Sequence, residues 1–303
     1  MPVPRIALTD DGPELSRIVQ GVWRLLEWDC SAGELLGLIH HALDLGITTF
    51  DHADIYGDYE VEEAFGEALA REPALRERLE LVTKCGIKLL SSNRPHHGVK
   101  HYDTSRAHIV ASAERSLKNL RTDRLDLLLI HRPDPLMDAD EIAGAFVALR
   151  EAGKVRHFGV SNFTPSQVAL LRSRLPFPLA TNQVECSVLH LDPLHDGTLD
   201  QCQRLGIAPM AWSPLGGGRL FTSNDPQARR LRQALTEVGE EHGDADLDQV
   251  ALAWLLRHPA RIVPVLGTGR EDRLTSAAAA AGIALTREQW FTIWTASTGT
   301  SVP

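Results

Sequence analysis

Short apolar segments alternate with segments of helical periodicity along most of the chain, and this alternation limits the possible folds more than any other feature. Most of the apolar segments are followed by apolar residues at helical spacing. Parallel strands joined by right-handed helical crossovers produce this order, and at this chain length eight of them close a barrel. We therefore expect an α/β fold, a (β/α)8 TIM barrel, with a doubly wound open sheet as the alternative. The expected strands lie at 18–23, 47–51, 80–85, 125–131, 155–160, 179–184, 207–212 and 261–266.

The two ends of the chain carry additions to the barrel. Residues 6–8 and 16–19, joined by Asp10-Asp11-Gly12, predict an N-terminal β-hairpin. Extra helices and a tail with Trp290 and Trp294 follow the last strand. No Pro/Ser-rich linker interrupts the sequence, so we expect residues 1–303 to form a single barrel domain. Expected helices lie at 31–45, 60–71, 105–120, 138–152, from Thr164-Pro165 onward, and at 196–205, 226–242, 247–257 and 270–281.

Composition excludes several classes of partner. The formal net charge of −9 argues against a nucleic-acid or membrane surface, and we expect a cytoplasmic protein that is a monomer or a weak oligomer. Four cysteines are scattered without a Cys-x-x-Cys pair, which is typical of thiols in a reducing compartment. His96, His97 and His101 lack a carboxylate at ligand spacing, so we expect no metal site.

Four titratable side chains lie at or just after the ends of three expected strands. Asp51 ends the strand at 47–51, Tyr56 follows in a turn, and Lys84 and His131 end the next two expected strands. In a parallel barrel these ends meet at one face, where function resides. A neighbouring ammonium would lower the phenol pKa, so Tyr56 could give and recover a proton near neutral pH. His131 could hydrogen-bond the same substrate oxygen. An isolated Asp51–Lys84 pair would more often be structural; the four together favour catalysis.

These four residues and their flanking motifs resemble the catalytic tetrad of the aldo-keto reductase family. The motifs are Phe-Asp-His-Ala-Asp-Ile-Tyr-Gly around Tyr56, Leu-Val-Thr-Lys before Lys84, and Leu-Leu-Leu-Ile-His-Arg-Pro-Asp around His131. The resemblance extends over about 16–283 and is closest to a bacterial subgroup of NADP-dependent oxidoreductases. It implies reduction of an aldehyde or ketone, a small-molecule carbonyl substrate, with Tyr56 as proton donor tuned by Lys84 and Asp51, and with His131 orienting the carbonyl.

The same resemblance implies NADP(H) as the cofactor. It assigns Ser161, Asn162 and Gln183 to the nicotinamide carboxamide, and places Trp212 against the nicotinamide ring. Residues implied elsewhere along the cofactor are Gly21, Trp23, Ser213, Leu215, Gly216, Arg219, Leu266, Gly267, Thr268, Gly269, Arg270 and Arg273. The guanidinium groups and a helix N-terminus in the last segment suit a 2′-phosphate. The chain departs from the family at Ser276 and Ala277, where many relatives have Glu-Asn against the adenine, which predicts a weaker grip there.

Two other functions fit parts of the sequence. A regulatory subunit that senses NADPH would keep the cofactor residues and show little turnover, although the complete tetrad favours catalysis. A phosphate-handling lyase or isomerase on the same barrel would leave Gln183, Trp212 and Arg273 without a shared role. The substrate depends on the loops at 24–30, 87–103 and 216–226 and on the C-terminal tail, and loops vary in sequence.

Overall fold

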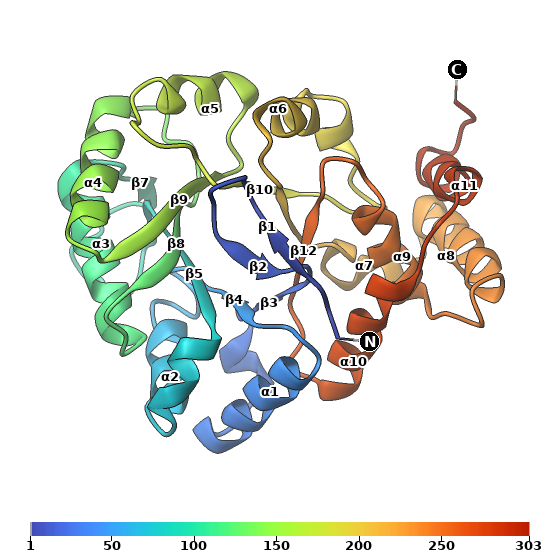
Figure 1. Cartoon of the computed structure of the whole chain (residues 1–303), viewed down its shortest axis with the longest axis horizontal. Coiled ribbons are helices and arrows are strands. Elements are labelled where there is room, and N and C mark those ends of the chain that lie inside the picture. The colour runs from blue at the N-terminus through green and yellow to red at the C-terminus, as the bar shows by residue number, and fades with distance from the viewer. Residues whose placement is uncertain (1, 303) are drawn as a thin grey trace.

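Eight parallel strands close into a barrel in the computed structural model, which describes residues 2–302 (Figure 1). Neighbouring strands follow the order β10-β11-β12-β3-β4-β5-β8-β9, and every pair is parallel. The predicted barrel is therefore confirmed, and the open sheet is wrong. The barrel strands are β3 (Val19–Gly21), β4 (Thr49–Asp51), β5 (Glu80–Cys85), β8 (Leu125–Ile130), β9 (Val155–Ser161), β10 (Asn182–Glu185), β11 (Met210–Trp212) and β12 (Val263–Leu266).

Helices surround the barrel (Figure 1), and all except α7 and α11 lie inside predicted ranges. Side-chain caps explain several of their starts: Ser31 and Thr164 each form a capping box with the third residue of the helix. A short helix, α7, after the glycines at 216–218 was not predicted. The helices are α1 (Ala32–Asp44), α2 (Val61–Leu69), α3 (Arg106–Asn119), α4 (Ala139–Glu151), α5 (Pro165–Arg172), α6 (Thr198–Leu205), α7 (Arg219–Thr222), α8 (Pro226–Glu240), α9 (Leu247–Leu256), α10 (Glu271–Ala279) and α11 (Arg287–Thr298).

The N-terminal hairpin closes one end of the barrel. It consists of β1 (Arg5–Ala7) and β2 (Glu14–Ser16), so the prediction of a second strand at 16–19 was wrong. Val19 pairs instead with Val265 of β12, because that segment begins the barrel sheet. Leu8 and Leu15 are fully buried in the same apolar cluster as residues inside the barrel. The hairpin thus fills the end at which the barrel strands begin.

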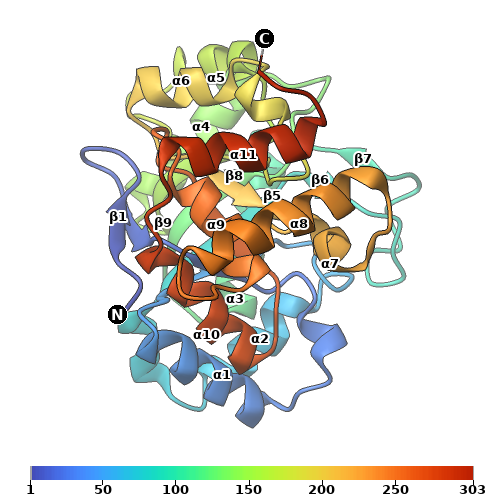
Figure 2. The ribbon, with the colours of Figure 1, turned by 90° about the vertical axis from the view of Figure 1, so that its right-hand side faces the viewer.

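The opposite end carries the long loops. Figure 2 shows the β1–β2 hairpin on one side of the molecule and β6, β7 and α7 on the other. The segment 87–103, predicted to be irregular, contains the two short antiparallel strands β6 (Ile87–Lys88) and β7 (His101–Tyr102). The carboxyl ends of the barrel strands lie beneath these loops, which is where the predicted site residues are found.

The C-terminal tail forms a helix that packs on the outside of the barrel. Helix α11 lies beside α8 (Figure 2). The Trp290 ring stacks on the buried Trp254 ring with centroids 4.7 Å apart, which ties α11 to α9. In the described part of the chain, none of the helices has both the length and the apolar character needed to cross a membrane.

Candidate active site

The Lys84 side chain lies at the centre of the predicted site and uses all three of its ammonium hydrogens. Its Nζ donates to Asp51 Oδ1 at 2.5 Å, to the Tyr56 hydroxyl at 3.0 Å and to the His52 carbonyl oxygen at 2.8 Å. An ammonium has three donors, so none is left unpaired. Only 1% of the Lys84 side chain is exposed, so this charge is held among these partners away from water.

Strand pairing explains why these side chains meet. Strand β4 ends at Asp51 beside β5, and the ladder continues past its end: the His52 amide donates to the Val82 carbonyl and the Asp54 amide to the Lys84 carbonyl. The chain then turns at Gly57, whose φ of +54° is a left-handed conformation suited to glycine. The turn places the Tyr56 hydroxyl over the Lys84 ammonium.

The pKa of Tyr56 shifts in the opposite direction to the one expected from the sequence. Burial alone would lower the pKa of Lys84, but the Asp51 carboxylate and Tyr56 together raise it above its usual value. Burial raises the pKa of Tyr56, and the Lys84 ammonium offsets this only in part. The expectation that the neighbouring ammonium brings the phenol pKa below its ordinary value was therefore wrong, because burial disfavours the phenolate more strongly. Tyr56 is protonated and Lys84 charged at neutral pH.

His131 stands beside the phenol as a neutral imidazole. It follows β8, its amide donates to the Cys85 carbonyl, and its ring meets the Tyr56 ring edge-on with centroids 5.9 Å apart. Burial, followed by the charges of Lys84 and Arg132, lowers the pKa of His131 well below its ordinary value. Its Nδ1 is buried without a hydrogen-bond partner among residues 2–302. A neutral imidazole offers one N–H donor, as a carbonyl oxygen requires.

Three polar side chains assigned to the carboxamide form one connected network. Ser161 Oγ donates to the Gln183 carbonyl at 2.8 Å, and Asn162 Nδ2 donates to Ser161 Oγ at 2.7 Å. Trp212 Nε1 donates to Asn162 Oδ1 at 2.9 Å. Gln183 Nε2 donates to Asp51 Oδ2 at 2.7 Å, a contact that the sequence analysis did not foresee. The network therefore joins the Asp51–Lys84 pair to the indole of Trp212.

Arg132 is a site residue that the sequence analysis missed. Its guanidinium lies over the Trp212 ring, 5.6 Å from the centroid. After burial and Lys84, its charge adds to the lowering of the His131 pKa, and it opposes slightly the rise that burial causes in the pKa of Tyr56. The available signal was its position directly after His131, at the end of the same strand. A side chain there extends the site beyond the catalytic residues.

The loop after β11 has a backbone suited to an anion. Ser213 and the three glycines Gly216, Gly217 and Gly218 all have positive φ, and Asn162 after β9 does as well. Successive amides in such conformations can turn toward one anion. Leu215 packs against apolar residues of the barrel exterior, and Arg219 is exposed with its guanidinium 3.3 Å from Asp225.

The segment after β12 ends the line of predicted cofactor residues. Gln20 Nε2 donates to the Thr268 carbonyl at 2.7 Å and fixes this turn to β3. Leu266 is buried, Gly267 is exposed, and Arg273 is exposed without an ion-pair partner among residues 2–302. Ser276 accepts a hydrogen bond from Gln249 and Ala277 is buried, so neither replaces the missing Glu-Asn pair.

Gly21 and Trp23 lie in different surroundings. A Cβ at Gly21 would be 2.4 Å from the Leu266 carbonyl oxygen, so close strand packing by itself requires glycine there. Trp23 is 58% exposed, and its ring centroid lies 6.4 Å from that of Tyr56. Trp23 therefore borders the phenol, whereas Gly21 shapes the barrel wall beneath it.

The donors present fit a dinucleotide laid across this end of the barrel. Amide and hydroxyl groups lie beside the predicted catalytic residues, several residues with positive φ follow β11, and guanidinium groups follow β12. These groups match a carboxamide, a pyrophosphate and a terminal phosphate respectively. The residues predicted to be catalytic and those predicted to bind the carboxamide are brought together by direct contacts. No contact links Arg219 or Arg273 to them in the described chain.

Comparisons with known proteins cover nearly all of the chain. The model of the Aldo/keto reductase family matches residues 17–297. The chain is 56% identical to oxidoreductase YdhF of Escherichia coli (strain K12), covering 99% of this chain and 100% of the relative. It is 54% identical to the uncharacterized oxidoreductase YcsN of Bacillus subtilis (strain 168), with 99% of each covered. Identity to a 6-dehydroglucose reductase of Agrobacterium fabrum is 47%, with 98% and 99% covered.

A solved structure has the same architecture. The thermostable aldo-keto reductase Tm1743, solved as a crystal structure with the inhibitor epalrestat, superposes with a TM-score of 0.80 at 29% identity. The alignment covers 97% of this chain and 99% of that one. Sequence and structure comparisons thus agree over the region that contains every predicted site residue.

Proposed function

The chain belongs to the aldo/keto reductase family of oxidoreductases, and from this premise we propose that it reduces an aldehyde or ketone carbonyl to an alcohol with NADPH. Its family membership confirms the resemblance inferred from the tetrad motifs. The observation that carries the proposal is the contact of the buried Lys84 ammonium with both the Tyr56 hydroxyl and the Asp51 carboxylate.

In this proposal Tyr56 supplies the proton. The nicotinamide, when bound, supplies a hydride to the carbonyl carbon. The Tyr56 hydroxyl gives its proton to the carbonyl oxygen as that oxygen gains negative charge. The Lys84 ammonium stabilises the phenolate that remains, and Asp51 keeps the ammonium in place and charged. A proton-donating phenol must be protonated before the reaction, which agrees with the raised pKa of Tyr56.

His131 orients the substrate. As a neutral imidazole it donates one hydrogen bond to the carbonyl oxygen without competing with Tyr56 for the proton. Its ring contacts the Tyr56 ring, so both groups can reach one oxygen atom. The exposed indole of Trp23 offers an apolar wall beside them.

Residues at the carboxyl ends of successive strands would bind successive parts of the cofactor, from the nicotinamide to the 2′-phosphate. Ser161, Asn162 and Gln183 would bind the carboxamide, and Trp212 would pack on the ring. Ser213, Leu215, Gly216 and Arg219 would surround the pyrophosphate. Thr268 and Arg273 would bind the 2′-phosphate, which favours NADPH over NADH. The exposed and unpaired guanidinium of Arg273 among residues 2–302 supports this preference.

A steady-state assay tests the proposal. NADPH consumption would be measured with the full-length protein against a panel of aldehydes and ketones. The name of the Agrobacterium fabrum relative supports including sugar-derived aldehydes in that panel. Tyr56→Phe is the control, because it keeps the ring and removes the proton. Equal turnover by Tyr56→Phe would contradict the proton-donor role; NADPH binding with no turnover on any carbonyl would favour a sensing subunit instead.

A further inference from the structure

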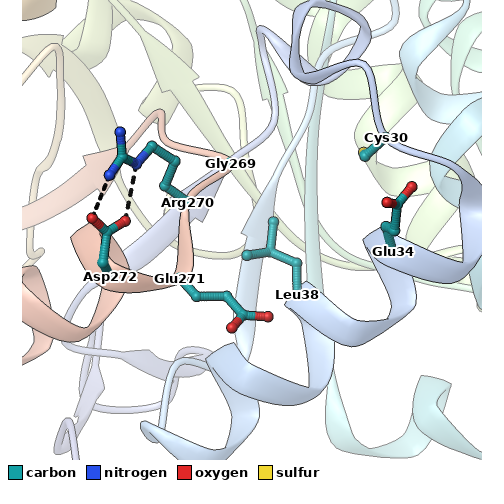
Figure 3. Close-up of a pocket in the computed structure, with 7 residues that line it drawn as sticks. All are labelled: Cys30, Glu34, Leu38, Gly269, Arg270, Glu271 and Asp272. Carbon is teal, nitrogen blue, oxygen red and sulfur yellow. Dashed lines mark hydrogen bonds and ion pairs between the residues drawn. The ribbon is translucent and has the colours of Figure 1, made fainter.

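A cavity of about 380 Å³ separates the start of α1 from the loop between β12 and α10 (Figure 3). Cys30, Glu34 and Leu38 line one side of the cavity, and 269–272 line the other. The second side lies between Thr268 and Arg273, the residues proposed to bind the 2′-phosphate. Any ligand group on this segment therefore meets the charges that border the cavity.

Those charges are unfavourable for a phosphate. Three carboxylates, on Glu34, Glu271 and Asp272, border the cavity together with a single guanidinium, on Arg270. Glu34 is engaged elsewhere, because its carboxylate accepts hydrogen bonds from the Ser31 amide and hydroxyl that begin α1. Among the three acids, only Asp272 forms an ion pair with Arg270 in the described chain.

The Arg270–Asp272 pair is bidentate. Arg270 Nε donates to Asp272 Oδ1 at 3.0 Å, and Arg270 Nη2 donates to Asp272 Oδ2 at 2.5 Å; Figure 3 shows both contacts as dashed lines. A carboxylate bound in this way presents two oxygens to two parallel N–H groups, as a phosphate does. Asp272 thus occupies one of the two edges through which the Arg270 guanidinium can bind a phosphate with two hydrogen bonds.

The pair is also open to exchange. The Arg270 and Asp272 side chains are 62% and 63% exposed, and exposed ion pairs are weak. An incoming anion can therefore displace Asp272, but it must compete with that carboxylate and approach its negative charge. Arg273, on the same helix turn, forms no ion pair among residues 2–302. The pKa of Asp272 is lowered mainly by its hydrogen bond to Arg270 and to a smaller degree by the charge of Arg273.

We propose that Asp272 acts as a built-in competitor of the 2′-phosphate for Arg270, and so limits the preference of this chain for NADPH over NADH. The inference rests on the proposed use of NADPH at this segment. It assigns a specificity-determining role to an acidic residue that would otherwise appear only to begin helix α10. Removing the Asp272 charge frees Arg270 to join Arg273 at the phosphate.

Isothermal titration calorimetry with two adenosine nucleotides measures the contribution of the 2′-phosphate to affinity without any catalytic turnover. Adenosine 2′,5′-bisphosphate and adenosine 5′-monophosphate differ only in the 2′-phosphate. For Asp272→Asn we expect about a two- to fivefold gain in affinity for the bisphosphate, the size of a surface ion pair, and no comparable gain for the monophosphate. Adding Arg270→Gln to Asp272→Asn should abolish the gain.

Glu271→Gln is the matched control. It removes the same charge from the same helix turn and cavity, but from a side chain without an arginine partner among residues 2–302. An equal gain in Glu271→Gln would overturn the inference, because general charge repulsion would explain it. If the wild type prefers the bisphosphate and Asp272→Asn changes nothing, this inference alone fails. If the wild type binds both nucleotides equally, the proposed 2′-phosphate site fails as well.

Discussion

The Lys84 ammonium donates a hydrogen bond of 3.0 Å to the Tyr56 hydroxyl while remaining fully paired with Asp51 and the His52 carbonyl. One cation therefore holds a carboxylate on β4 and a phenol in the following turn at fixed positions. Its charge matters most when the phenol has lost its proton, since the resulting phenolate is partly withdrawn from water.

We expect Lys84→Met to lower kcat for carbonyl reduction by at least about 100-fold, because the phenolate loses its counter-charge. It should also lower the free energy of unfolding by about 3–5 kcal/mol, since Asp51 is left as an unpaired buried charge. Steady-state kinetics and urea unfolding measure the two effects. Lys154→Met is the control: Lys154 pairs with Glu114 in a more exposed position just before β9, so it should change neither quantity strongly. Similar losses in both variants would contradict the assignment.

Arg273→Ala should weaken NADPH binding about tenfold or more, as expected for a lost charge-assisted hydrogen bond, and leave NADH binding nearly unchanged. The reason is that the two cofactors differ only in the 2′-phosphate. Fluorescence titration of the protein tryptophans with each cofactor measures both affinities. An equal loss for NADH and NADPH would remove the 2′-phosphate assignment.

The buried Asp54 carboxyl predicts how stability depends on pH. Burial raises the pKa of Asp54 to about 7, with Ser112 as its hydrogen-bond donor. The folded chain thus keeps a proton that the unfolded chain releases near its ordinary pKa of about 3.9, so Asp54 makes stability fall as pH rises from there to about 7. Asp54→Asn removes this contribution, and its stability relative to wild type should rise between pH 5 and pH 7.

Urea unfolding of both proteins across that pH range measures the difference. In Asp54→Asn, the fall of the unfolding free energy with rising pH should be smaller than in the wild type but still present. It persists because burial also raises the pKa of the neighbouring Glu62. A constant difference between Asp54→Asn and wild type over the whole range would show that Asp54 is already ionised in the folded chain.

Gly21→Ala tests the packing of β3 against β12. A Cβ would lie 2.4 Å from the Leu266 carbonyl oxygen and 3.0 Å from Val265 Cγ1, so we expect a loss of about 1–3 kcal/mol in the free energy of unfolding. Gly37→Ala is the matched control on α1, where a Cβ meets nothing within 4 Å in the described chain and alanine should stabilise the helix. Thermal unfolding compares the two. An undiminished melting temperature for Gly21→Ala would contradict the packing argument.

The barrel and the grouping of Asp51, Tyr56, Lys84 and His131 were predictable because both follow from position along the chain. Alternating strands and helices imply parallel pairing, and parallel pairing brings strand ends to one face. The same logic predicted that Trp212 and Asn162 lie near the site, and they share a hydrogen bond.

The sequence alone could not predict features that depend on contacts between segments far apart along the chain. The raised pKa of Tyr56 depends on burial by neighbours far along the chain. The hydrogen bond from Gln183 to Asp51 joins residues 132 positions apart. The hairpin strand at 14–16 was misplaced because residues 16–19 are as apolar as a strand, while pairing with β12 decides which sheet Val19 joins. Local pattern does not contain such pairings.

The β1–β2 hairpin fills the end of the barrel opposite the candidate active site, so a group attached near the N-terminus lies away from that site. Because Leu8 and Leu15 belong to the same buried apolar cluster as Val82 and Leu127, deleting the first strands would expose the barrel interior to water and promote aggregation. A purification tag or surface linker joined to the N-terminal segment, in contrast, would extend from the side of the molecule opposite β6, β7 and α7 (Figure 2). Immobilisation through that end should therefore leave substrate entry unobstructed.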